Sequence, residues 1–357
     1  MTPRPMTLRP TTPRPTTSSD RAGSSRSLSR LAVLGALAGA LVLSGCGTQD
    51  ALVGLHPAPV EKTESAPLDA EGAAAVAARL LDAVDAADAE KDAKAAAKAR
   101  AAVLAGDALT VANAEAARTG PAPAPTELAA QPEPTIVAQS QGREWPRAIL
   151  AATLDDDTNT QFLHVMVSET PDQPFQIVSS VPMFGGAELP ALGAANTGSP
   201  LLETSAADGL VVSPEKAVAA YAAAIAQPKG RPSDAVSADD PFAAGLRTTA
   251  AAQAKALGKL GTLTQKHEPL LEHAVTFRLA DGGAVTFGLM RRTDTIAVKP
   301  TAKELVLPAE YAKVTGTKKV TKSLTLQSLE PVVVVVPTTG KAKVIGAREL
   351  LVSGKGR

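Results

Sequence analysis

Residues 331–337 read Pro-Val-Val-Val-Val-Val-Pro, and this stretch decides the fold class. Valine favours β-strands because its branched side chain packs well on a pleated surface. Side chains alternate between the two faces of a strand, so five consecutive valines place apolar groups on both faces. The prolines at the two ends limit the pairing of this segment with other chains. We therefore expect a strand that is buried on both faces.

The segments around the valines predict further strands, with helices ahead of them. Ser213, Pro214 and Glu215 combine an N-cap, a proline at the first helical position and an early acid, which is typical of a helix start. Apolar residues at helical spacing continue this helix to Gln227, and a second helix is expected over 241–260. Strands are then expected over 263–268, 273–280, 284–298, 322–329, 332–336 and 344–352.

The first half of the chain has the same order of elements. Residues 70–118 are rich in alanine and carry an apolar stripe, which predicts helix, and Asp69 is placed to cap its start. Prolines within 121–125 end this helical region. Strands are expected over 135–140, 145–154, 161–168 and 175–184, with a polar turn at 155–159.

Helices followed by antiparallel strands indicate an α+β fold. The order occurs twice, and residues 185–210 are rich in Gly, Pro, Ala and Ser. We therefore expect two helix-then-antiparallel-sheet domains in tandem. Domain 1 is expected over 70–190, a linker over 191–210 and domain 2 over 211–357.

The first 45 residues have the composition of a secretory signal peptide. Residues 1–30 contain six arginines and one acid, and residues 31–43 are apolar without a charge. The sequence that follows, Leu43-Ser44-Gly45-Cys46, resembles the lipobox of bacterial lipoproteins. The resemblance implies that a signal peptidase recognises Leu43, Ser44 and Gly45, and that Cys46 becomes the lipidated N-terminus of the mature chain.

Alternatives stay open for this region. A transmembrane helix with an incidental cysteine needs about 20 apolar residues, and the run over 31–43 is shorter. Translation can begin at Met1 or at Met6. Residues 46–69 are expected to form a flexible tether with a root-mean-square reach of about 25 Å, which holds the fold just off the bilayer.

The charge of the chain is balanced overall and unequal along its length. The chain has 36 basic and 36 acidic side chains in 357 residues, which argues against a general nucleic-acid binder. Residues 46–250 hold 13 basic and 27 acidic side chains, whereas residues 251–357 hold 17 and 8. Two interpretations are open: the halves attract each other, or the second half offers a basic docking face to anionic components of the cell envelope.

The sequence contains none of the common catalytic or nucleotide-binding motifs. The sequence has no Gly-rich nucleotide loop and no hydrolase nucleophile elbow. Cys46 is the only cysteine, and lipidation removes it from any metal site. His267 and His273 flank a connection between strands and could meet, but two ligands are weak evidence for a metal. We expect no metal and no cofactor.

Three side chains are candidates for a pocket: Trp145, His164 and Tyr221. His164 is expected to share a strand face with Phe162 and Met166. The alternative is that His164 is an ordinary strand residue without an acid beside it, and that Trp145 is simply part of the core.

The chain also resembles two wider groups. The lipobox, the segments WPRAIL (145–150), GGAELP (185–190) and SPEKAVAAY (213–221), and the hairpin over 331–353 resemble an uncharacterised family of actinobacterial lipoproteins. This resemblance implies no particular activity. Each half is similar in its order of elements to the cone-shaped α+β fold of nuclear-transport-factor-2-like domains. That fold hosts both enzymes and binding modules, so it implies no single function.

The sequence thus predicts a lipoprotein anchored through Cys46 on the extracytoplasmic face of the cell membrane, with a non-catalytic binding or assembly role. The expected partner is a hydrophobic small molecule or lipid, or an envelope protein, and nucleic acid is not expected. The competing hypothesis is a cone-fold enzyme, an isomerase or a hydrolase, that uses His164 as a pocket histidine.

Overall fold

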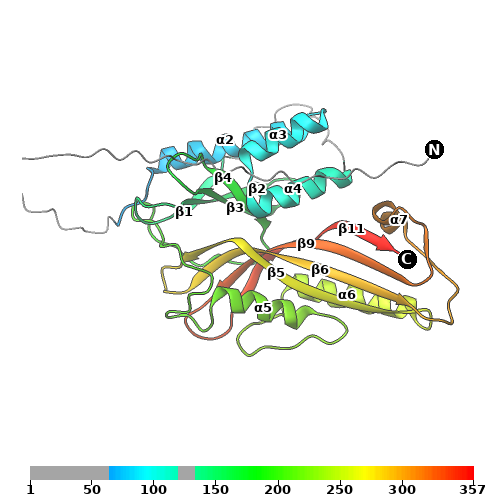
Figure 1. Ribbon diagram of the computed structural model, residues 1–357. Helices are drawn as coiled ribbons and strands as arrows, with labels where there is room; N and C mark the ends of the chain where they lie inside the picture. Colours follow the sequence, from blue (N-terminus) through cyan, green and yellow to red (C-terminus); the bar gives the residue numbers. More distant parts are fainter. Residues whose placement is uncertain (1–63, 120–132) are drawn as a thin grey trace, which may run out of the picture. The chain divides into compact units, whose positions relative to one another are not determined.

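The computed structural model describes residues 64–119 and 133–357 of the chain (Figure 1). Residues Glu61–Arg357 gather into one compact unit. The expected signal peptide, Cys46 and the tether up to residue 63 lie outside the described residues.

The described residues form helices and antiparallel sheets, which confirms the α+β class. The helices are α2 (Ala70–Ala89), α3 (Ala93–Val103), α4 (Gly106–Thr119), α5 (Pro214–Ile225), α6 (Pro241–Leu257) and α7 (Ala309–Thr315). The strands are β1 (Thr135–Gln139), β2 (Arg147–Asp155), β3 (Thr160–Ser168), β4 (Gln176–Pro182), β5 (Gly261–Arg278), β6 (Ala284–Val298), β7 (Leu305–Val306), β8 (Lys319–Val320), β9 (Ser323–Val336), β10 (Lys343–Ala347) and β11 (Leu350–Gly356).

The strands form two principal sheets. Sheet 1 has the order β1-β2-β3-β4. Sheet 2 has the order β10-β9-β6-β5, and β11 also pairs with β9. The short strands β7 and β8 pair with each other. Neighbouring strands are antiparallel in both principal sheets, as the expected hairpins require.

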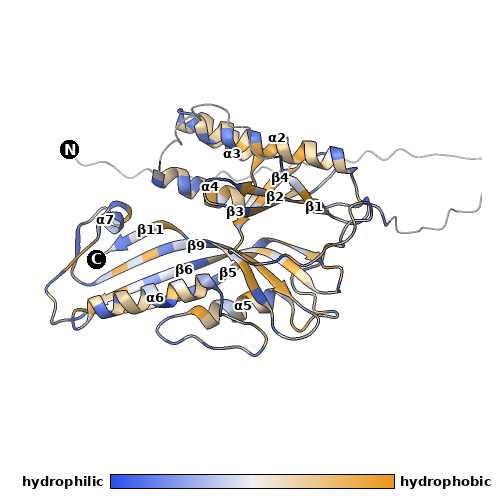
Figure 2. Cartoon of the chain, turned by 180° about the vertical axis from the view of Figure 1, so that it is seen from behind, coloured by the Kyte–Doolittle hydropathy of each residue, from blue (hydrophilic) through white to orange (hydrophobic). Residues whose placement is uncertain are grey.

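The two sheets pack face to face, and helices cover their outer faces (Figure 1). One apolar core joins Leu150 and Val165 of sheet 1 to Phe287 and Val333 of sheet 2. Helices α2 and α4 cover the other face of sheet 1, and α5 and α6 cover the other face of sheet 2. Helices α2 and α6 carry both hydrophobic and hydrophilic residues (Figure 2), as expected of helices with one face on a sheet.

The valine strand has the environment that its sequence predicts. Val332, Val334 and Val336 pack in the core beneath α5. Val333 and Val335 pack in the core between the sheets. None of the five is more than 4% exposed, so the prediction of a strand covered on both faces is confirmed.

The strand β9 continues through Pro331, where the sequence predicted two separate strands. Along one edge β9 pairs with β10 over residues 332–335 and with β11 over residues 324–329. Pro331 lies at the exchange between these partners, where a residue without an N–H group is tolerated. The expected strand over 344–352 is divided into β10 and β11 at the same place.

Two further features differ from the sequence-based expectation. Strand β5 runs across the expected break at 269–272, with a register shift between Leu270 and Val275 that is typical of a β-bulge. Helix α7 and strands β7 and β8 were not predicted. Helix α7 has only seven residues and buries none of them, so its sequence carries little periodic signal.

The predicted helix starts are confirmed. The carboxylate of Asp69 accepts a hydrogen bond of 2.7 Å from the N–H of Gly72 at the start of α2. Ser213 caps α5, and Pro214 occupies its first turn. Asp240 caps α6 and also accepts a hydrogen bond of 3.0 Å from the hydroxyl of Tyr221, which links α5 to α6.

Residues 191–210, which the sequence predicts as a linker, contact sheet 2. Leu192 and Leu201 form bridges with Leu279 and Phe277 at the end of β5. The two sheets also approach closely at Gly346 in β10, where an added Cβ would lie 2.5 Å from the carbonyl oxygen of Pro182. Glycine is therefore required at this junction by the space available.

Candidate binding groove

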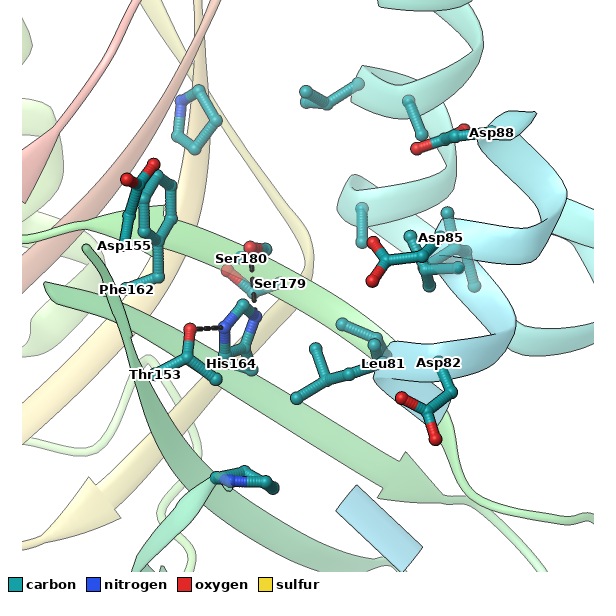
Figure 3. A pocket seen from close by; sticks show the side chains of 18 of the residues that line it. Leu81, Asp82, Asp85, Asp88, Thr153, Asp155, Phe162, His164, Ser179 and Ser180 are labelled. Carbon is teal, nitrogen blue, oxygen red and sulfur yellow. Dashed lines mark hydrogen bonds between the residues drawn. The ribbon is translucent and has the colours of Figure 1, made fainter. Parts of the chain in front are cut away.

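A groove of about 850 Å³ lies between helices α2 and α4 and the helix-covered face of sheet 1 (Figure 3). Nine carboxylate residues line it: Asp82, Asp85, Asp88, Asp107, Glu115, Glu133, Asp155, Asp156 and Asp157. Apolar side chains line it as well, among them Leu81, Val84, Val111, Phe162, Ile177 and Pro331. The groove is thus both strongly acidic and partly apolar.

Helix α2 supplies the acids of one wall. Asp82, Asp85 and Asp88 are three residues apart, so they lie on one side of the helix. In Figure 3 these three carboxylates follow one another along the helix, opposite the strands that carry His164 and Ser180. All three acids line the groove, and the Asp85 carboxylate points toward His164 (Figure 3).

The turn between β2 and β3 supplies three more acids. The Asp155 carboxylate accepts hydrogen bonds of 3.0 Å from the N–H groups of Asp157 and Thr158, which stabilises the turn. Asn159 follows with a φ of 52°, a conformation that asparagine tolerates. The local turn chemistry therefore places the carboxylates of 155–157 at the groove.

Two of the acids form ion pairs with arginine. Asp88 lies 3.5 Å from the guanidinium of Arg100, and Glu115 lies 3.3 Å from that of Arg348. Arg348 is the arginine among the lining residues and stands at the junction of β10 and β11. Its neighbour, Glu349, reaches Arg292 instead.

Burial changes the pKa of two acids of the groove, Asp107 and Asp88. It raises the pKa of Asp107 to about 6, partly offset by the nearby His273, whereas Glu272 adds to the increase. Burial also raises the pKa of Asp88, although Arg100 acts in the opposite direction. Negative charge at these two positions is therefore energetically costly, and a bound cation near them would reduce that cost.

His164 lies on the floor of the groove and is 7% exposed. Its Nε2 lies 2.9 Å from the Thr153 hydroxyl and its Nδ1 lies 3.1 Å from the Ser180 hydroxyl (Figure 3). Its ring stacks on Phe162 at a centroid distance of 6.3 Å. Burial lowers the pKa of His164 to about 4, so the imidazole is neutral at pH 7. The predicted shared face with Phe162 and Met166 is confirmed by the strand register.

The other two pocket candidates lie elsewhere. Trp145 precedes β2, is 37% exposed, and stacks with the guanidinium of Arg147 at 3.7 Å from the ring centroid. Tyr221 is fully buried in the core between α5 and sheet 2. Neither Trp145 nor Tyr221 is a lining residue of the groove, so the structure does not bring the three candidates together.

A second polar cluster was not predicted from the sequence. His267 Nδ1 lies 2.7 Å from a carboxylate oxygen of Glu330, and both side chains are fully buried. The Arg292 guanidinium lies 3.3 Å from Glu330 and 3.2 Å from Asp294. The available signal was the charged residues at alternate positions of β6, Arg292 and Asp294, which share with His267 and Glu330 the face beneath α5 and α6.

The described residues give no metal site. Within 64–119 and 133–357, no three side chains of His, Cys, Asp or Glu are arranged to hold a metal ion. His267 contacts Glu330, whereas His273 packs against Gly106 at the start of α4. None of the helices in these two ranges has both the length and the apolar character that a membrane span needs.

The chain matches a protein-family model over most of its length. The model of a family described as "Domain of unknown function (DUF8094)" matches residues 68–356. No curated protein and no solved structure matches the chain.

Proposed function

The chain belongs to this family of unknown function, and we propose that it is a cell-envelope lipoprotein that binds a cationic, partly apolar ligand in the acidic groove. The observation that carries the proposal is the groove itself, where nine carboxylates surround apolar side chains. Its volume of about 850 Å³ falls in the range of small-molecule sites, which is about 300–1,000 Å³.

The charge of the lining selects the ligand class. Arg348 and the neutral His164 are the basic residues that line the groove, and the nine carboxylates outnumber them. A ligand with an amine or guanidinium group would add favourable charge interactions with these acids, whereas an anion would be repelled by them. Apolar side chains such as Leu81 and Phe162 suit an alkyl or aromatic body. A positively charged segment of an envelope protein would have the same chemistry.

The proposed role is binding without chemical change. Both ring nitrogens of His164 form hydrogen bonds with hydroxyl groups, those of Thr153 and Ser180. Neither of these partners is a carboxylate. A base with a pKa of about 4 is also far from the value near 7 that suits proton transfer at neutral pH.

The enzymatic alternative has one observation in its favour. His164, with its perturbed pKa, lines the same groove as carboxylates that could act as partners after a movement. A cone-fold isomerase or hydrolase would need this arrangement. Turnover that is abolished by His164→Gln, in a chain that still binds the ligand, would support the enzyme.

We further propose that the chain consists of two cone-like units in tandem, one in each half. The support is their shared order of elements, since α2–α4 precede and cover sheet 1, and α5–α6 precede and cover sheet 2.

The membrane anchor at Cys46 is supported by the lipobox-like sequence alone. Labelled fatty acid should enter the wild type and not Cys46→Ala, and equal labelling would contradict the anchor.

Native and denaturing mass spectrometry of residues 47–357 tests the binding proposal first. These residues retain the compact unit and lack Cys46. Extra mass that is lost on denaturation and belongs to an organic cation would support it. Titration calorimetry with decyltrimethylammonium, and with the neutral decyl maltoside as comparison, should show binding of the cation only.

A matched pair of variants locates the site. Asp82→Asn with Asp156→Asn removes two charges from the groove and should weaken cation binding by roughly tenfold. Glu169→Gln with Asp172→Asn removes two charges from exposed positions that do not line the groove, and should leave binding unchanged. Equal losses in both variants would show that the cation follows the overall charge and not the groove.

A further inference from the structure

Four strand ends meet at one end of sheet 2. Gly261 at the start of β5 pairs with Val298 at the end of β6. Ala297 pairs in turn with Ser323 at the start of β9. The carbonyl of Arg357, which follows β11, accepts hydrogen bonds from the N–H groups of 321 and 322 at 2.9 and 2.8 Å. Residues 258–260, 298–306, 317–323 and 355–357 therefore lie together, and we name them the basic end.

The basic end concentrates positive charge. It carries eight exposed basic side chains: Lys259, Lys299, Lys303, Lys318, Lys319, Lys322, Lys355 and Arg357. Glu304 is the acidic side chain within these residues, and it pairs with Lys319 at 2.5 Å. Eight of the 17 basic side chains of residues 251–357 thus lie in these four short segments, which contain one acidic side chain.

Exposed apolar side chains lie among these lysines. Leu260 is 45% exposed and Val306 is 71% exposed, and they are two of the four large hydrophobic side chains that the described residues leave exposed. The N–H of Lys299 donates to the carbonyl of Leu260 at 2.8 Å, and Val306 pairs with Lys319. Each exposed apolar residue is therefore held directly beside a lysine.

We propose that the basic end docks on an anionic lipid bilayer. Clusters of about four to eight basic residues attract anionic headgroups, and apolar side chains among them insert at the boundary between headgroups and acyl chains. A soluble polyanion would engage the lysines but would give Leu260 and Val306 no apolar partner. The combination of charge and exposed apolar surface favours the bilayer. This site is separate from the groove and does not depend on its ligand.

Vesicle sedimentation tests the docking. Residues 47–357 lack Cys46, so their binding reports this surface and not the lipid anchor. They should sediment with vesicles of equal parts phosphatidylcholine and phosphatidylglycerol, and not with phosphatidylcholine alone. Binding should fall at high salt, because the Debye length decreases from about 10 Å at 0.1 M to about 3 Å at 1 M. Equal sedimentation with both kinds of vesicle would overturn the proposal.

Charge variants locate the surface. Each lysine at an anionic surface strengthens binding by about fivefold, so Lys299→Gln, Lys322→Gln and Lys355→Gln together should weaken it by about 100-fold. The control is Lys91→Gln, Lys94→Gln and Lys98→Gln, which removes the same charge from exposed positions at α3. The control should bind as the wild type does, and an equal loss in it would overturn the proposal.

Apolar variants separate a bilayer from a soluble polyanion. Leu260→Gln with Val306→Gln should weaken vesicle binding by about tenfold and leave binding of polyphosphate unchanged. Vesicle binding that is insensitive to these two changes would overturn the bilayer in favour of a soluble polyanion. Both side chains are exposed, so the variants should keep the wild-type circular dichroism and melting temperature, which verifies that they fold.

Discussion

At the scale of single residues, the carboxylate of Glu330 is fully buried and therefore needs charged or hydrogen-bonding partners. Its carboxylate lies 2.7 Å from His267 and 3.3 Å from Arg292, beneath α5 and α6. Removing the Glu330 carboxylate takes from the buried His267 the partner of its Nδ1 and leaves Arg292 with Asp294 and Glu349. The stability of this region therefore depends on all the partners being present.

Glu330→Gln keeps the size of the side chain and removes its charge. We expect it to reduce the free energy of unfolding by about 3–5 kcal/mol, measured by urea denaturation. Glu268→Gln is the control, because it breaks an exposed ion pair with Arg291 on the same sheet and should cost less than about 1 kcal/mol. Equal costs would mean that burial does not govern the effect.

The neutral His164 predicts a dependence of stability on pH. Its pKa is lowered from 6.5 to about 4, so below pH 6.5 the unfolded chain takes up a proton that the folded chain does not. The stability contributed by neutral His164 is therefore present above pH 6.5 and is lost as the pH falls towards 4.

His164→Gln removes this dependence. Between about pH 7.5 and about pH 4.5 the wild type should lose about 2–3 kcal/mol more free energy of unfolding than the variant does. The raised pKa of Asp107 acts with the opposite sign in the same range, but it is common to both proteins and cancels in the difference. Parallel pH profiles would contradict the prediction.

At the scale of elements, the close approach of β10 to the end of β4 makes a local prediction. A Cβ on Gly346 would lie 2.5 Å from the Pro182 carbonyl oxygen, so Gly346→Ala must displace one sheet from the other. We expect a loss of about 1–3 kcal/mol in the free energy of unfolding. Gly185→Ala is a control three residues beyond Pro182, because its added Cβ meets no atom within 4 Å.

The elements also show what the sequence could predict. The valine strand and the caps at Asp69 and Ser213 were predictable, because periodicity and capping act within a few neighbouring residues. Helix α7 was missed because it buries no residue. The division at Pro331 depends on which strand lies beside it, and that is set by tertiary pairing and not by local sequence.

The candidate site was predicted only in part. His164 and its strand face could be placed from alternation alone. Eight of the nine acids of the groove come from α2, α4 and the turn at 155–157, which are far apart in the sequence, and no local pattern indicates that they converge. The partners of Glu330 on β5 and β6 were missed for the same reason.

At the scale of the whole molecule, the shared core predicts how the chain unfolds. Leu150 and Val165 of sheet 1 and Phe287 and Val333 of sheet 2 belong to one apolar core. Neither sheet can lose its partner without exposing that core to water, so we expect residues 47–357 to unfold in one transition.

Two probes test this expectation. The fluorescence of Trp145, the only tryptophan, reports the first half, and far-ultraviolet circular dichroism reports all the elements. Their denaturation curves should coincide. An earlier transition in the fluorescence would mean that the first half unfolds by itself.

The junction of β10 and β11 has a consequence for mutual influence at a distance. Arg348 pairs with Glu115 at the groove, and the next residue, Glu349, pairs with Arg292 of the buried cluster. Two consecutive residues thus connect the groove and the buried cluster, which are two separate charged regions of the protein. A ligand that displaces Arg348 from Glu115 would shift the backbone between Arg348 and Glu349. Binding in the groove would therefore change the ion pair between Glu349 and Arg292 in the buried cluster.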